Sequence, residues 1–70
     1  MLFIINITWH RRTPEAGRPQ TGRATYAMTG RTFNAAKAKA VRKFNRHFGM
    51  HLAVDDVSEF QDPAGILTNH

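Results

Sequence analysis

The spacing of four cationic residues is the clearest chemical pattern in the chain. They recur three or four positions apart, which places them on one face of a helix, and they are Lys39, Arg42, Lys43 and Arg46. The segment 35–48 contains no Asp or Glu, so these like charges repel one another with no relief from within the segment. A solvated helix face is the simpler interpretation. The missing acids favour a surface that binds nucleic acid or an acidic protein patch.

Six further cations extend this prediction. Lys37 lies near the start of the same segment, and five arginines outside it are expected to assist: Arg11, Arg12, Arg18, Arg23 and Arg31. All ten Lys and Arg residues lie in residues 1–51, which carry a net charge of +9, whereas residues 52–70 carry −4. A chain with a pI near 10.9 attracts polyanions from a distance, although surplus arginine also keeps small proteins in solution.

The histidines suggest a metal site but do not support one. His47 and His51 have a spacing found in some zinc sites, yet structural zinc takes four ligands and usually cysteine, which the chain lacks. Gly49 lies between them and should end the helix, and nothing places His10 or His70 beside the pair. We expect no metal and no cofactor.

The acids do not form a recognisable catalytic set. Asp55, Asp56 and Glu59 fall in a predicted strand, where neighbouring side chains alternate between faces. The sequence has no nucleophile triad, phosphate-binding loop or cofactor motif. We therefore expect a protein that is not an enzyme and has no small-molecule substrate. The acids would offset the basic residues or form a second, negative patch.

The elements that must position these residues follow from local patterns. Strands are predicted at about 2–12, 23–31 and 53–61, with a helix at about 35–48 between the second and third. Asn34 is expected to be the N-cap, and Gly49 a left-handed stop.

The apolar residues of these elements predict the core. The helix is expected to bury Ala36, Ala40, Val41, Phe44 and Phe48. Trp9 and Tyr26 are aromatic residues that could stack on bases, but both follow the inward period of their strands, which favours a place in the core.

The order of the elements predicts an α+β fold. A ββαβ chain that lays its last strand along the free edge of the first gives a three-stranded sheet in the order 2-1-3, with strand 1 central and one helix on one face. Leu2 and Ile4 then lie on a sheet face with nothing to cover them, which predicts a protein contact, either with a second copy in a homodimer or with another protein. A structural module that dimerises here, with incidental charge, is the alternative function.

Seventy residues make one domain, 1–70, with one small core and a tail at 62–70. The opening residues lack the features of a signal peptide, and no segment is apolar enough to span a membrane. We expect a cytoplasmic protein that does not bind membranes.

Three features together resemble small phage-encoded accessory proteins of the anti-CRISPR type: the strand that begins at residue 2, the basic helix that opens Phe33-Asn34-Ala35-Ala36-Lys37-Ala38-Lys39-Ala40, and the closing Val57-Ser58-Glu59-Phe60. The resemblance implies an inhibitor of a host nucleoprotein defence complex, acting in the bacterial cytoplasm without chemistry of its own. Many such inhibitors are acidic mimics of nucleic acid, whereas this chain is basic. It would instead contact the nucleic acid held by the complex, or an acidic protein patch.

Overall fold

The computed structural model describes residues 1–60, which form three strands and one helix. The elements are β1 (Leu2–Arg11), β2 (Thr21–Thr29), α1 (Phe33–Phe48) and β3 (Leu52–Glu59). The predicted tail at 62–70 and the last residue of the predicted third strand lie outside the described residues. The predicted α+β fold with the order ββαβ is confirmed.

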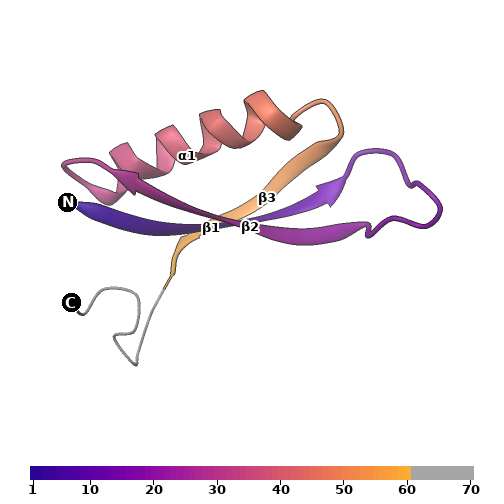
Figure 1. The fold of residues 1–70 in the computed structure, drawn as a ribbon, viewed down its shortest axis with the longest axis horizontal. Coiled ribbons are helices and arrows are strands. Elements are labelled where there is room, and N and C mark those ends of the chain that lie inside the picture. Colours follow the sequence, from indigo (N-terminus) through magenta and orange to yellow (C-terminus); the bar gives the residue numbers. More distant parts are fainter. Residues whose placement is uncertain (61–70) are drawn as a thin grey trace.

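The strands form one antiparallel sheet in the order β2-β1-β3, as predicted. Strand β1 is central and antiparallel to both neighbours, while α1 covers one side of the sheet (Figure 1). We call the side covered by α1 the inner face and the opposite side the open face. The β1–β2 hairpin extends past the end of the helix (Figure 1), so its loop, residues 12–20, is not covered by α1.

The register of the strands decides which side chains face the helix. Ile5 pairs with Tyr26 and Ile7 pairs with Ala24, so paired residues point to the same side. Ile5 and Ile7 are fully buried, which places the odd-numbered residues of β1 on the inner face. The even-numbered residues therefore lie on the open face.

The core lies between α1 and the inner face. Ala36 and Ala40 are fully buried, and their small side chains let the helix lie close to the sheet. Phe44 is the largest fully buried side chain. Seven residues make up the buried core of the described chain: Phe3, Ile5, Ile7, Ala36, Ala40, Phe44 and Leu52.

Both ends of the helix differ from the prediction. The N-cap is Thr32 and not Asn34: its Oγ1 accepts a hydrogen bond from the backbone N–H of Ala35 at 3.2 Å. The helix starts here because Phe33 packs edge-on against Phe3, with ring centroids 6.0 Å apart. At the other end, Gly49 has φ −60°, so the predicted left-handed stop is wrong.

The helix also buries less of its predicted core face than expected. Val41 is only half-buried, and Phe48 is 45% exposed. Phe48 lies in the last turn of α1, where its ring packs against Phe44, with ring centroids 5.4 Å apart, and is not enclosed by the sheet. Phe48 was wrongly assigned to the core for this reason.

The predicted strand ends are also shifted. Strand β2 runs from residue 21 to 29 and not from 23 to 31, because Gly22 pairs with Trp9, whose ring occupies the space of the missing side chain. Between Thr8 and Trp9 the β1–β3 register shifts, which leaves Asp55 without an opposite residue and forms a β-bulge.

Candidate functional site

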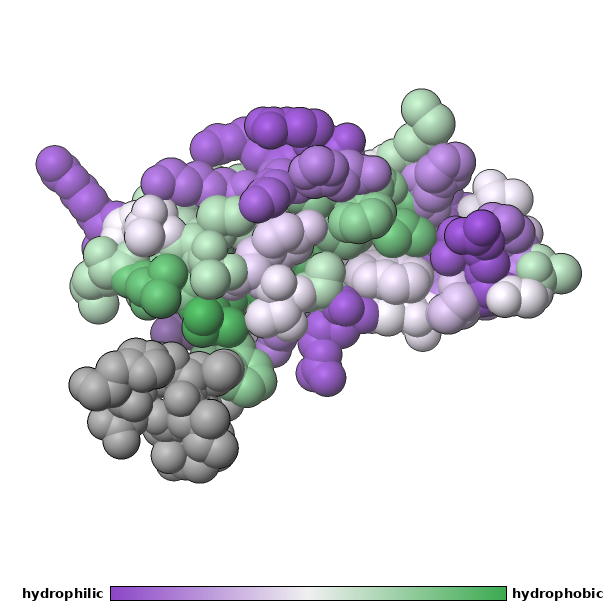
Figure 2. Space-filling view, viewed as in Figure 1, coloured by the Kyte–Doolittle hydropathy of each residue, from purple (hydrophilic) through white to green (hydrophobic). Residues whose placement is uncertain are grey.

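The basic stripe, Lys39, Arg42, Lys43 and Arg46, lies on one side of α1 as the spacing predicted. At 3.6 residues per turn these four positions span about 100° of the helix circumference, centred away from the buried Ala36, Ala40 and Phe44. All four stripe residues are exposed. Hydrophilic residues cover the outer surface of the helix in the space-filling view (Figure 2).

The stripe is tilted toward β2. Lys39 donates a hydrogen bond from Nζ to the carbonyl of Thr29 at 2.9 Å, and Lys43 Nζ lies 5.9 Å from the centroid of the Tyr26 ring. Burial raises the pKa of the Tyr26 hydroxyl, so the ring stays neutral beneath the lysine. These contacts hold two of the four cations in defined positions and leave Arg42 and Arg46 facing solvent.

Among residues 1–60 no acidic side chain lies within ion-pair distance of any stripe residue. The acidic residues that do form ion pairs in this part of the chain are used elsewhere: Asp55 pairs with His10, and Glu15 pairs with Arg11 and Arg18. The stripe is therefore neither scattered nor neutralised by the acids of β3.

Lys37 does not belong to this surface. It lies on the other flank of α1, between Phe44 and Phe48 in angle, and is half-buried.

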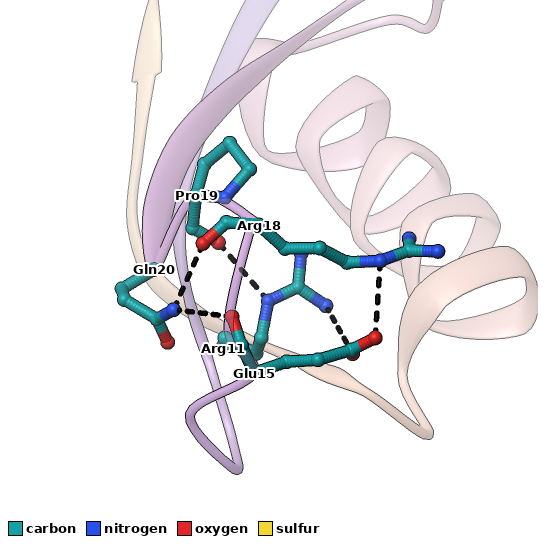
Figure 3. A network of polar contacts seen from close by, with 5 residues as sticks. All are labelled: Arg11, Glu15, Arg18, Pro19 and Gln20. Carbon is teal, nitrogen blue, oxygen red and sulfur yellow. Dashed lines mark hydrogen bonds and ion pairs between the residues drawn. The ribbon is translucent and has the colours of Figure 1, made fainter.

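Three predicted arginines gather at the hairpin loop. Arg12 Nε donates to the carbonyl of Gly49 at 2.9 Å, and its backbone N–H donates to His51 at 2.8 Å, so the loop is tied to the end of the helix. A cation on the last carbonyls of α1 also complements the helix dipole. Arg11 Nε donates to the carbonyl of Pro19 at 3.0 Å, and only 12% of its side chain is exposed (Figure 3).

A turn brings Glu15 and Arg18 together. The N–H of Arg18 donates to the carbonyl of Glu15 at 3.2 Å, and Gly17 between them has φ +80°, which glycine adopts without strain. Arg18 Nε then lies 3.1 Å from Glu15 Oε1 (Figure 3). Gln20 fastens the loop through hydrogen bonds from Nε2 to the carbonyls of Glu15 and Arg18.

The remaining two arginines lie apart from both groups. Arg23 pairs with Thr8 across the strands, so its side chain is on the open face, on the far side of the sheet from α1. Arg31 is exposed in the connection between β2 and α1. The ten predicted cations thus form a helix group and a loop group, with Lys37, Arg23 and Arg31 outside them.

Leu2 and Ile4 lie on the open face as predicted. Leu2 is 62% exposed and Ile4 is half-buried. Phe60 adds to them, because its N–H donates to the carbonyl of Ile4 at 2.7 Å and its side chain is 36% exposed. Within residues 1–60 no element covers this apolar patch, to which Ala27 also belongs through its pairing with Ile4.

A cavity of about 420 Å³ is the feature that the sequence did not predict. It lies between the end of α1, the start of β3 and the hairpin loop. Its aromatic walls are Trp9 and Phe48, which we had assigned to the core, and the loop supplies Arg11, Arg18 and Glu15. No signal in the sequence indicated it, because the exposure of Phe48 is apparent only in the folded chain.

Two other classes of site are absent from the described part of the chain. Residues 1–60 hold no cluster of three or more His, Asp or Glu side chains that could bind a metal ion. They also contain no helix with the length and apolar character needed to cross a membrane. Neither family models, curated proteins nor solved structures match this chain, so its function must be argued from its own residues.

Proposed function

We propose that this protein binds nucleic acid through the basic stripe on α1 and has no catalytic activity of its own. One observation carries the proposal: four cations lie along one helix surface with no acidic partner among residues 1–60. Each phosphate that the stripe neutralises releases condensed counterions, which favours binding at low salt. The contacts go to the backbone and so tolerate different base sequences.

Binding measured across a salt series tests this proposal. If all four stripe residues contact phosphates, the logarithm of the affinity should fall with the logarithm of salt with a slope of about −3.6 for duplex DNA and about −2.8 for single strands. An unchanged affinity between low and high salt would contradict the proposal.

Two single charge reversals distinguish binding by the stripe from attraction by the net charge of the protein. Arg42→Glu and Arg23→Glu change the total charge equally, but Arg42 is on the helix and Arg23 is on the open face. We expect Arg42→Glu to weaken binding roughly tenfold and Arg23→Glu to change it less than twofold, because direct contacts to a charged group contribute about 1.5–3 kcal/mol. Equal effects would mean that only the net charge matters.

The narrower prediction, an inhibitor of a host nucleoprotein defence complex, depends on the resemblance to phage accessory proteins. Its test is a pull-down from bacterial lysate with and without nuclease. Partners that disappear after nuclease treatment would support capture through nucleic acid. Partners that persist would point to an acidic protein surface.

A structural module that dimerises is the second candidate function. The exposed Leu2 and Phe60, beside Ile4 on the open face, favour it. Light scattering should then give twice the monomer mass, and Leu2→Lys should restore the monomer. A monomer at high concentration, or a dimer indifferent to Leu2→Lys, would reject this interface.

A further inference from the structure

The cavity at the end of α1 has two aromatic walls that the core does not fully use. Phe48 is 45% exposed, and Trp9 is half-buried. Phe48 leans against Phe44 on one side, with ring centroids 5.4 Å apart, and its other side borders the cavity. Flat apolar walls of this kind favour a flat aromatic ligand.

The polar rim of the cavity offers both donors and an acceptor. Arg18 uses Nε on Glu15, and its two terminal guanidinium nitrogens have no partner among residues 1–60. Arg11 is held by Pro19 and borders the same space, so its guanidinium is already in place before a ligand arrives. The Glu15 carboxylate can accept a hydrogen bond from an amino or imino group. The rim therefore suits a ring with hydrogen-bonding edges and a linked anion.

The cavity adjoins the C-terminal turn of α1, where the basic stripe ends. Arg46 and His47 lie in the last turn of α1, directly before Phe48. Hydrophilic residues cover the outer surface of the helix and part of the hairpin loop, with hydrophobic residues between them (Figure 2). Phe48 is about 160° around the helix from Arg46, so a strand of phosphates along the stripe has to turn around the end of α1 to reach the cavity.

We infer that the cavity receives one unpaired base of single-stranded nucleic acid, stacked against Trp9 and Phe48, with a neighbouring phosphate on Arg18. This inference rests on the proposed function and makes it more specific, because the bases of a duplex are already stacked and cannot enter. The volume of about 420 Å³ falls within the range of roughly 300–1,000 Å³ of small-molecule sites. An acidic peptide would pair with the arginines but leave the aromatic walls Trp9 and Phe48 uncovered.

Tryptophan fluorescence tests the inference directly, because Trp9 is the only tryptophan in the chain. The wild-type protein is titrated with a single-stranded oligonucleotide and with an abasic oligonucleotide of the same length and charge. We expect the intact strand to quench Trp9 and to bind roughly tenfold more tightly, the effect of stacking one base. Inorganic polyphosphate should bind without quenching.

Two variants test whether the base stacks against Phe48. Phe48→Ala should lower the affinity for the intact strand roughly tenfold and leave the affinity for the abasic strand unchanged. Met50→Ala is the matched control: Met50 is 84% exposed two residues away and does not line this cavity. Circular dichroism confirms that each variant is folded, and the wild-type titration does not depend on either.

The outcomes distinguish the inference from the proposed function. Equal, salt-dependent affinity for intact and abasic strands, without quenching, would overturn the base pocket and leave the basic stripe standing. No binding to any oligonucleotide at low salt would overturn both. Quenching by polyglutamate but not by an oligonucleotide would assign the cavity to an acidic protein.

Discussion

The two solvent-facing surfaces of this molecule treat their charged groups in opposite ways. On the open face His10 Nδ1 lies 2.5 Å from Asp55 Oδ1, and Thr25 donates to Asn6 at 2.7 Å. On the outer surface of α1, Arg42 and Arg46 have no such partner among residues 1–60. The open face pairs some of its polar groups within the fold, although Arg23 and Asp56 lie there without an ion-pair partner among residues 1–60. The helix surface instead gathers four cations on one side without an acidic partner among residues 1–60, and this difference is the basis for our proposal that the helix side binds.

The two surfaces differ only while α1 is packed on the sheet. A variant that breaks this packing should therefore have the largest effect on stability. Phe44→Ala empties a fully buried site, and we expect a loss of about 3–5 kcal/mol, enough to unfold much of so small a domain. Phe48→Ala, on the same helix but 45% exposed, should cost about 1 kcal/mol or less. Urea denaturation measures both, and equal losses would contradict the assigned packing.

Removing a charge from the open face should have a smaller effect, confined to stability. Asp55→Asn breaks the pair with His10, and because both side chains are about half exposed we expect a loss of about 0.2–1 kcal/mol. Asp56→Asn is the control, since the Asp56 side chain has no ion-pair partner within residues 1–60. Nucleic-acid affinity should not fall in either variant. A fall would place the binding surface on the open face.

Charge reversal on the helix should change stability and binding in opposite directions. Arg42→Glu places a carboxylate three residues after Lys39 and four before Arg46, which replaces repulsion by attraction and should add about 0.2–0.5 kcal/mol per pair. The same change weakens binding. Thermal unfolding at low and high salt measures the gain, which should shrink as salt rises. If Arg42→Glu is less stable than the wild type at low salt, the stripe cations do not destabilise the helix by repulsion.

The smallest effect should appear only in alkali. Burial raises the pKa of Tyr26 in the folded protein, so above about pH 10 the unfolded chain loses this proton first and stability falls as pH rises. Below that pH the group contributes no pH dependence. Tyr26→Phe should remove this part of the alkaline decline in urea midpoints measured from pH 8 to 11. If Tyr26→Phe shows the same decline as the wild type, the decline is caused by the lysines and not by Tyr26.

Most of the fold was predictable because its patterns are local. The alternation from Phe3 to Trp9 identified the inward side of β1, and the spacing of the helix cations identified their common face. The helix start was not predictable in this way, because Thr32 and Asn34 are both good N-caps. The contact of Phe33 with Phe3, thirty residues away in the chain, decided between them.

The site was predictable only where it lies on one element. The basic stripe needs nothing but the period of a helix, and it was found from the sequence. The cavity needs the hairpin loop, the end of α1 and the start of β3 to meet, which depends on Arg12 bonding to Gly49 and His51. No local pattern encodes a contact across thirty-seven or more residues.

The sequence by itself therefore determined the elements and the cationic helix surface, since periodicity acts within a single strand or helix. It also determined the sheet order, since the crossover helix lays the last strand along the free edge of the first. Tertiary structure alone decided which of the ten cations share a surface, that Phe48 is exposed, and that Trp9 lines a cavity. The physical reason is that the exposure of a side chain depends on which distant residues pack against it. Here those neighbours are set by the bulge at Asp55 and by the hairpin loop, which form only when the chain folds.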